Sequence, residues 1–365
     1  MNKKRSTQEV LLEQYQKYPE MQLQDFMKFL FQSAFGCEHL VSDMDTAANR
    51  IQKEAEGYEE SQGELTEALD GAFCRVSLGW LQKGLRAETL AALFVLSAET
   101  VPDGTEKLEE KLGVFLSMCE EGLFPFSKEE VLLHTQSWKA AGYPPCHHSE
   151  RFRTLYKPSY RLLKKELVPF LPLFAMVDRE LEAVRKGEKE QVLLAVEGGS
   201  ASGKTTLGGL LQKIYPVTIF HMDDFFLRPE QRTKERLAEA GGNVDRERFL
   251  EEVLQPLKQG AEVVYRPFDC GTQSLMEPVK VHPQAFCVIE GAYSMHPLLA
   301  DYYDRSVFLR VSEETQKDRI RKRNAPFLAE RFFKEWIPME ERYFRAFSVP
   351  ERCDRILFGE NEESC

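Results

Sequence analysis

The spacing of hydrophobic residues differs between the two halves of the chain. In the first half, apolar side chains recur at intervals of three or four residues, as in Val10, Leu11 and Tyr15 and again within residues 26–31. This interval places apolar side chains on one face of an α-helix. We find no convincing strand in this half, and we therefore predict an all-α domain over residues 1–185.

Short apolar runs alternate with helical patterns in the second half. The predicted strands are residues 191–196, 217–221, 262–265, 285–290, 306–311 and 355–358, and the predicted helices are residues 204–214, 246–258, 313–324 and 328–345. Strands that alternate with helices are typical of a parallel sheet with helices on both faces. A short charged segment, residues 185–191, is typical of a surface connection. We therefore predict an α/β domain over residues 186–365.

A glycine-rich stretch follows the first predicted strand. Gly198, Gly203, Lys204 and Thr205 match the phosphate-binding pattern G-x-x-x-x-G-K-[ST], for which we expect roughly 0.01 chance matches in a chain of this length. The glycines allow a tight turn whose N–H groups surround a phosphate, the lysine reaches the outer phosphates, and the Ser/Thr hydroxyl binds Mg²⁺. The helix that follows directs its positive end at the same anion. The expected nucleotide-binding residues are Gly198, Gly199, Ser200, Ala201, Ser202, Gly203, Lys204, Thr205 and Thr206.

Carboxylates occur at the ends of two other predicted strands. Asp223 follows the second predicted strand, Glu290 ends the fourth, and a polar segment at residues 265–272 follows the third. Ligands of open parallel sheets bind beyond the carboxyl ends of the strands. Glu290 could therefore serve Mg²⁺ directly or through water, and Asp223 could accept the proton of a substrate hydroxyl. The alternative for each carboxylate alone is a strand-end cap.

Five motifs in this half resemble those of one enzyme family. They are Gly198-Gly-Ser-Ala-Ser-Gly-Lys-Thr-Thr, Met222-Asp-Asp-Phe-Phe, Asn243-Val-Asp, Tyr265-Arg-Pro-Phe-Asp and Val288-Ile-Glu-Gly. They resemble the uridine kinase-like family of P-loop kinases, which includes phosphoribulokinase and bacterial pantothenate kinase. The resemblance covers residues 191–324 well and residues 325–365 loosely, and it does not reach the first half.

The resemblance implies a kinase that uses ATP and Mg²⁺ and transfers a phosphoryl group to a hydroxyl of a small metabolite. The residues that it implies are Asp223, Lys204, Arg319 and Arg323 for catalysis, Thr205 and Glu290 for the metal, and Asp245, Phe226, Tyr265 and Phe268 for the substrate. In this reading Asp245 holds ribose hydroxyls. Arg319 and Arg323 lie on a basic helix that closes over ATP, where a planar guanidinium suits phosphate oxygens.

The sequence departs from the family at the expected acceptor site. The segment 269–275 lacks the histidine and arginine of nucleoside-specific members, and Phe268 stands where a tyrosine is usual. The resemblance makes a uridine-like nucleoside the first candidate acceptor, and these departures leave a sugar or a pantothenate-like compound open as alternatives. A different class of function, also open, is a nucleotide-gated regulatory protein in which the helical half is the effector.

Histidines gather in two stretches of the first half, residues 31–40 and 143–162. His39, His147 and His148, with Glu38 and Glu150, could hold a metal or serve acid–base chemistry. Alternatively, Ser149 caps a helix and the histidines make hydrogen bonds between helices. The two stretches resemble a helical bacterial domain of unknown function, which supplies no activity.

Composition narrows the range of partners. The formal net charge of −11 argues against binding to nucleic acid or to an anionic membrane surface. No apolar run approaches the roughly 20 residues that span a bilayer. The eight cysteines form no C-x-x-C pair, which is typical of reduced thiols in a cytoplasmic protein. A small-molecule substrate is the expected partner, and the sequence leaves both a monomer and a homo-oligomer open.

Overall fold

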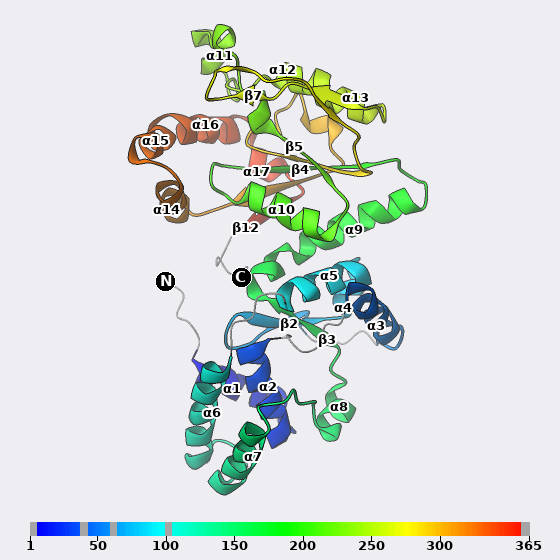
Figure 1. The fold of residues 1–365 in the computed structure, drawn as a ribbon, viewed down its shortest axis with the longest axis vertical. Coiled ribbons are helices and arrows are strands. Elements are labelled where there is room, and N and C mark those ends of the chain that lie inside the picture. Colours follow the sequence, from blue (N-terminus) through cyan, green and yellow to red (C-terminus); the bar gives the residue numbers. More distant parts are fainter. Residues whose placement is uncertain (1–5, 37–42, 59–63, 99–103, 359–365) are drawn as a thin grey trace. The chain divides into compact units, whose positions relative to one another are not determined.

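The chain forms two compact units, Met1–Ala175 and Met176–Cys365. The computed structural model describes residues 6–36, 43–58, 64–98 and 104–358 (Figure 1). The division falls within helix α9 (Leu171–Arg185), whereas the sequence places the boundary after residue 185. A continuous helix shows no break in its apolar spacing, so the sequence pattern carries no signal of a division inside it.

Unit 1 contains the predicted helices. They are α1 (Thr7–Lys17), α2 (Leu23–Phe35), α3 (Met44–Glu56), α4 (Gly79–Gln82), α5 (Ala87–Ala98), α6 (Thr105–Glu120), α7 (Lys128–Ala140) and α8 (Glu150–Tyr156). Aromatic side chains form much of the core between them. Phe26 and Phe115 are both fully buried and stack with ring centroids 5.0 Å apart. Burying such large apolar surfaces is the main force that holds the helices together.

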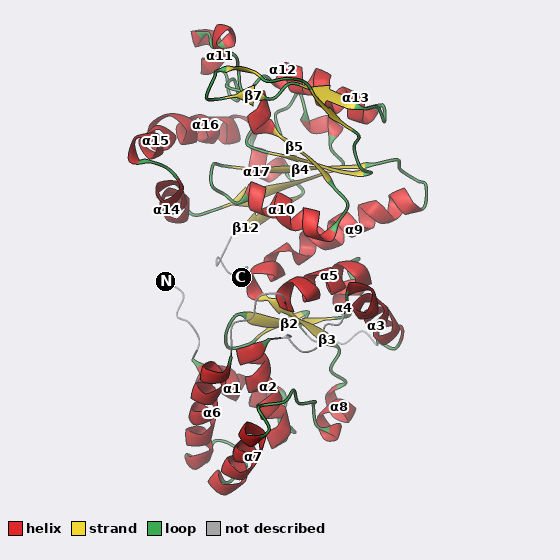
Figure 2. Cartoon of the chain, in the orientation of Figure 1, coloured by secondary structure: helices red, strands yellow, loops and turns green. Residues whose placement is uncertain are grey.

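The prediction that this half contains no strand is wrong. A three-stranded antiparallel sheet is formed by β1 (Thr66–Ala68), β2 (Phe73–Ser77) and β3 (Tyr160–Lys164), in the order β1-β2-β3; Figure 2 shows it among the helices of unit 1. The central strand was hidden by Arg75, which is 3% exposed and interrupts the apolar run. The buried guanidinium of Arg75 donates hydrogen bonds to Gln32 and Gln14, which lie far away in the sequence. The residues around Arg75 in the sequence therefore do not indicate that it is buried.

Unit 2 contains the predicted parallel sheet. Its strands are β4 (Val192–Gly198), β5 (Thr218–His221), β10 (Phe286–Glu290), β11 (Arg305–Arg310) and β12 (Arg355–Phe358), all parallel and in the order β12-β11-β4-β10-β5. Every residue of β4 and β10 is buried. Strands covered on both faces need such continuous apolar runs, which is why the sequence pattern located them.

Helices cover the two faces of this sheet. Helix α10 (Lys204–Ile214) contacts β4 and β10. The other face carries α12 (Arg246–Phe249), the π-helical turn η4 (Leu250–Leu254) and α13 (Gln255–Lys258) (Figure 1). The C-terminal part continues through α14 (Glu313–Arg323), α15 (Pro326–Arg331), the π-helical turn η6 (Phe332–Trp336), α16 (Ile337–Phe347) and α17 (Val349–Arg352). The prediction of an α/β domain is confirmed.

One predicted strand does not belong to the parallel sheet. Residues 262–265 contain β6 (Val263–Tyr265), which pairs antiparallel with β9 (Val279–Val281). Val264 is 41% exposed between two buried neighbours, so the strand has one solvated face, unlike the fully buried strands of the sheet. The remaining short strands, β7 (Phe268–Asp269) and β8 (Ser274–Leu275), form a small hairpin.

Two expectations from composition concern membrane-spanning segments and disulfide bonds. Among the described residues, no helix combines the length and the apolar character that crossing a lipid bilayer requires. The six cysteines in the described part of the chain are free thiols. Cys287 is fully buried in β10, as expected for a core residue.

Candidate functional site

Three neighbouring strands of unit 2 end at the same edge of the sheet. Strand β10 lies between β4 and β5, and Glu290 at its end pairs with Val196 on one side and His221 on the other. The chain leaves β4 at Gly198 and leaves β5 through the 3₁₀ turn η2 (Met222–Phe225), which contains Asp223. The sheet therefore gathers the predicted nucleotide, metal and catalytic residues at one edge.

The glycine-rich loop (residues 198–205) turns sharply between β4 and α10. Gly198, Ala201 and Gly203 have φ angles of 150°, 58° and 106°. A Cβ atom on Gly198 would lie 2.7 Å from the carbonyl oxygen of Leu309, so this position requires glycine. Helix α10 begins at Lys204 without a side-chain cap, and the N–H groups of its first turn form an anion-binding end.

Lys204 joins the two arms of the glycine-rich loop. Its Nζ atom donates to the carbonyl oxygens of Gly198 and Gly199, both at 2.9 Å. The ammonium group is thus held against the start of the loop, and Lys204 is itself the first residue of α10. A cation and a helix N-terminus at one point form an arrangement that stabilises phosphate oxygens.

Thr205 and Glu290 bring two oxygen ligands together. The Thr205 hydroxyl donates to Glu290 Oε1 at 3.1 Å, and the same oxygen lies 2.7 Å from His221 Nδ1. Burial acts to raise the pKa of Glu290, but the hydrogen bonds with His221 and Thr205 and the positive charge of Lys204 together outweigh it, and the pKa is lowered. Glu290 is therefore ionised at neutral pH. A hydroxyl beside a carboxylate suits Mg²⁺, which usually takes few protein ligands and completes its shell with water and phosphate.

Asp223 lies at the same edge of the sheet as Lys204 and Glu290, and both act on it electrostatically. Its side chain is exposed, yet nearby protein atoms partly desolvate the carboxyl group and raise its pKa, while Lys204 acts in the opposite direction. Glu290 also acts electrostatically on it and raises its pKa further. Because Asp223 is open to solvent, a substrate hydroxyl can reach it. A raised pKa brings a carboxylate closer to the range that suits a general base.

The basic helix α14 reaches the outside of the glycine-rich loop. Gln316 donates to the carbonyl oxygen of Ser200 at 2.8 Å, and Arg319 Nη1 donates to that of Ala201 at 3.1 Å. Arg323 lies in the last turn of α14 and is exposed. The structure thus brings Arg319 to the loop, whereas Arg323 lies one turn further along the helix.

Asp245 is already engaged by its own protein. The residue is 4% exposed. Its carboxylate caps α12 by accepting from the Arg248 backbone N–H at 3.3 Å, and it accepts from Gln231 Nε2 at 2.8 Å. Asp245 can bind two substrate hydroxyls only if the hydrogen bond from the Gln231 amide to Asp245 Oδ2 breaks.

The predicted aromatic substrate residues lie around η2. Phe226 forms a β-bridge with Val244. Tyr265 is buried and donates to Asp224 Oδ2 at 3.3 Å. Phe268 is also buried, and the guanidinium carbon of Arg232 lies 5.6 Å from its ring centroid. Of the three aromatic side chains, Phe226 alone is partly exposed.

Three site residues escaped the sequence interpretation. They are His221, which contacts Glu290, Glu197, which lies under the glycine-rich loop, and Glu340, which contacts that loop from α16. Glu197 is fully buried, accepts from the backbone N–H groups of Gly198 and Met295, and has a pKa that burial raises to about 7. A charged residue at the end of an apolar run could have indicated Glu197. The others depend on contacts between distant segments.

Within the histidine cluster predicted in unit 1, His148 makes hydrogen bonds to other side chains. His148 Nδ1 lies 3.1 Å from Asp25 Oδ1, and Nε2 lies 2.7 Å from the Tyr160 hydroxyl. Ser149 caps α8, as the second interpretation predicts. His147 is exposed, and His39 and Glu38 lie outside the described residues. In the part of the chain that is described, no three His, Cys, Asp or Glu side chains are grouped to hold a metal ion.

Buried His148 predicts how the stability of unit 1 changes with pH. Burial lowers the pKa of His148 from 6.5 to about 4. Between these values the unfolded state binds a proton that the folded state does not, so the free energy of unfolding falls as pH drops from about 6.5 to 4. Between pH 7 and 5, the free energy of unfolding of His148→Gln should fall by up to about 2 kcal/mol less than that of the wild type.

The measurement is urea unfolding followed by tryptophan fluorescence in a Trp336→Phe background. The remaining tryptophans, Trp80 and Trp138, both lie in unit 1. The control is His147→Gln, which changes an exposed neighbour. If the free energy of unfolding changes equally with pH in the wild type and in His148→Gln, His148 is not buried as a neutral group.

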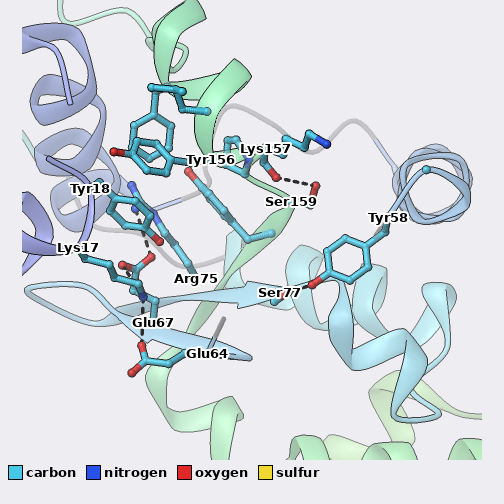
Figure 3. A pocket seen from close by; sticks show the side chains of 15 residues that line it. Lys17, Tyr18, Tyr58, Glu64, Glu67, Arg75, Ser77, Tyr156, Lys157 and Ser159 are labelled. Carbon is cyan, nitrogen blue, oxygen red and sulfur yellow. Dashed lines mark hydrogen bonds and ion pairs between the residues drawn. The ribbon is translucent and has the colours of Figure 1, made fainter. Parts of the chain in front are cut away.

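Unit 1 also contains a cavity of about 350 Å³. Figure 3 shows Arg75, Tyr18 and Tyr156 on its walls. The Arg75 guanidinium is fixed by Gln32 Oε1 at 2.8 Å and lies 4.9 Å from the Tyr160 ring centroid. A cavity of this size with aromatic walls and a few fixed polar groups is the place in unit 1 at which a small ligand would first be sought.

Solved structures with similarity to this chain include three proteins described as kinases. A candidate uridine kinase from Bacillus stearothermophilus is 20% identical, with 50% of this chain and 98% of that chain covered and a TM-score of 0.37. A candidate fructose transport system kinase from Silicibacter sp. TM1040 is 22% identical, with coverage of 50% and 97% and a TM-score of 0.42. A shikimate kinase from Bacteroides thetaiotaomicron is 16% identical, with coverage of 47% and 90% and a TM-score of 0.26. No protein-family model and no curated protein matches the chain.

Proposed function

We propose that unit 2 is an ATP- and Mg²⁺-dependent kinase that phosphorylates a hydroxyl group of a small metabolite. The observation that carries the proposal is the meeting of three groups at one edge of the sheet. These are the glycine-rich loop with Lys204, the oxygen pair of Thr205 and Glu290, and the open carboxylate of Asp223. A phosphate site alone is common to many nucleotide-binding proteins, but a carboxylate open to an acceptor beside it suits phosphoryl transfer.

The residues present fit both implied groups. The positive φ angles of Ala201 and Gly203 turn the loop tightly into α10, whose N-terminal end has no side-chain cap and can face phosphate oxygens. Thr205 and Glu290 would hold Mg²⁺, which fits their hard oxygen atoms. When bound, ATP supplies the phosphoryl group and Mg²⁺ neutralises part of the phosphate charge.

Each protein group then has a defined task. Lys204 stabilises negative charge on the outer phosphates. Asp223 accepts the proton of the acceptor hydroxyl and thereby makes its oxygen a better nucleophile. Arg319 holds the loop through Ala201 and supplies positive charge beside it. Arg323 lies one turn further along α14 and is exposed.

Among acceptors, we place a uridine-like nucleoside first. The support is a carboxylate, Asp245, that could bind paired hydroxyls, together with the aromatic side chains of Phe226, Tyr265 and Phe268 near η2. The bond from Gln231 to Asp245 makes a sugar or a pantothenate-like compound a serious alternative. An acceptor that binds without displacing Gln231 would favour these alternatives.

The test is ADP formation against a panel of nucleosides, sugars and pantothenate-like alcohols. The proposal expects at least one acceptor to raise ADP production well above ATP hydrolysis in water. A panel compound that is phosphorylated only by protein with an intact Asp223 identifies the acceptor class. Tight nucleotide binding with no phosphorylated product from any panel member would favour a regulatory role instead.

A further inference from the structure

Helix α16 contacts the glycine-rich loop through Glu340. The Ser200 backbone N–H donates to Glu340 Oε2 at 2.9 Å, and the Ser200 hydroxyl donates to Oε1 at 2.6 Å. Both carboxylate oxygens are thus used on one residue of the loop. The two partners lie 140 positions apart in the sequence, and Glu340 is only 5% exposed.

A second bond from the same helix supports the base of the loop. The Tyr343 hydroxyl donates to Glu197 Oε2 at 3.0 Å, and Tyr343 is fully buried. Glu197 in turn accepts from the backbone N–H of Gly198 at 2.8 Å. Helix α16 therefore contacts Ser200 directly and reaches Gly198 through Glu197, so it fixes both the tip and the start of the loop.

Burying a carboxylate beside a phosphate site has a cost. Burial raises the pKa of Glu340, while Lys204 and the two bonds from Ser200 act to lower it. A buried negative charge also opposes the binding of a polyphosphate nearby. Glu340 therefore has two unfavourable effects, desolvation of its own carboxylate and repulsion of a nearby polyphosphate. Its presence here is best explained by the geometry that it imposes on Ser200. Hydrogen bonds to a charged acceptor are among the stronger ones in proteins.

We propose that Glu340 is a positioning residue of the nucleotide site. It holds the Ser200 N–H and hydroxyl on the outer side of the loop, so that the loop keeps its open cradle before ATP arrives. Gln316 fixes the next peptide unit, because it donates to the Ser200 carbonyl oxygen. The segment that follows α14 is then part of the ATP site. This inference rests on the proposed function, because it assumes that the loop binds ATP.

The experiment compares Glu340→Gln and Glu340→Ala with Glu341→Ala. Glu341 is the matched control because it is exposed on the same helix and pairs with Arg345 there, at 3.0 Å. The titration measures the Kd of a non-hydrolysable ATP analogue with Mg²⁺ on the full chain. We expect Kd to rise about tenfold or more in Glu340→Ala and less in Glu340→Gln, which keeps one acceptor oxygen. Glu341→Ala should match the wild type.

Two further readouts separate positioning from a general loss of structure. Circular dichroism and thermal unfolding without nucleotide should show Glu340→Gln folded as the wild type is. With Ser200→Ala, the effect of Glu340→Gln should be smaller than in the wild type, because the two residues act as a pair. With the best acceptor, KM for ATP should rise more than kcat falls.

The outcomes are distinguishable. If the wild type binds the analogue and both Glu340 variants bind it as tightly or more tightly, the positioning role is overturned while the proposed function stands. If the wild type binds no ATP analogue, the proposed function fails and this inference fails with it.

Discussion

Replacing Asp223 with asparagine should lower kcat by about 10²- to 10⁴-fold, the range that a positioned general base usually contributes. Asparagine keeps the shape of the side chain but cannot accept the acceptor's proton. Because Asp223 is exposed, the fold should tolerate the change. The Kd for ATP should stay within a few-fold of the wild type, since removing a negative charge from this edge does not hinder phosphate binding. Steady-state ADP formation with the best acceptor measures the effect.

The matched control is Asp224→Asn, the next residue in the same turn. Asp224 accepts a hydrogen bond from Tyr265, so its loss should disturb local structure and reduce kcat less than the loss of Asp223 does. If Asp224→Asn removes turnover while Asp223→Asn retains it, the base has been assigned to the wrong carboxylate. Equal turnover by the wild type and Asp223→Asn contradicts the role of Asp223 altogether.

Replacing Lys204 with alanine should weaken ATP binding by about two orders of magnitude and remove detectable phosphoryl transfer. The ammonium group ties Lys204, at the end of the loop, to Gly198 and Gly199 at its start, and we expect it to supply the positive charge for the phosphates. A charge-assisted bond of this kind contributes about 1.5–3 kcal/mol, and losing the bridge adds to that. Calorimetric titration with Mg²⁺ and a non-hydrolysable ATP analogue measures the Kd.

Lys213→Ala provides the control for Lys204. Lys213 lies in the last turn of the same helix, α10, and is exposed at its other end. It should bind the analogue as the wild type does. Unchanged affinity in Lys204→Ala, with Lys213→Ala also unchanged, would mean that nucleotide binds elsewhere on the chain.

The residues at the sheet edge could be predicted because their signals are local. Gly198 to Thr205 form a continuous pattern, the apolar run that ends in Glu290 identifies the buried strand β10, and the run before Asp223 identifies the partly buried strand β5. Parallel pairing then brings the ends of these strands together without further information. The predicted alternation of strands and helices was sufficient to place three distant segments at one edge.

The features that were missed depend on contacts between distant residues. Arg75 disguised β2 because Gln14 and Gln32, from two helices, satisfy its buried guanidinium. His221 gains its role only because β5 lies beside β10. In the sequence, Glu340 is one of several charged residues of an amphipathic helix. Its contact with Ser200 is seen only in the structure. No spacing along the chain reports such pairings.

Transfer of the γ-phosphoryl group of ATP to a hydroxyl by unit 2 can be followed directly with a label. The full chain is incubated with Mg²⁺ and ATP labelled in the γ-phosphate, in the presence of the acceptor panel, and the labelled products are separated from inorganic phosphate. We predict a labelled phosphate ester from at least one acceptor, formed at least about 10²-fold more slowly by Asp223→Asn and not detected with Lys204→Ala. Label that remains in ATP or appears only as inorganic phosphate with every acceptor, from protein that binds ATP tightly, would contradict it.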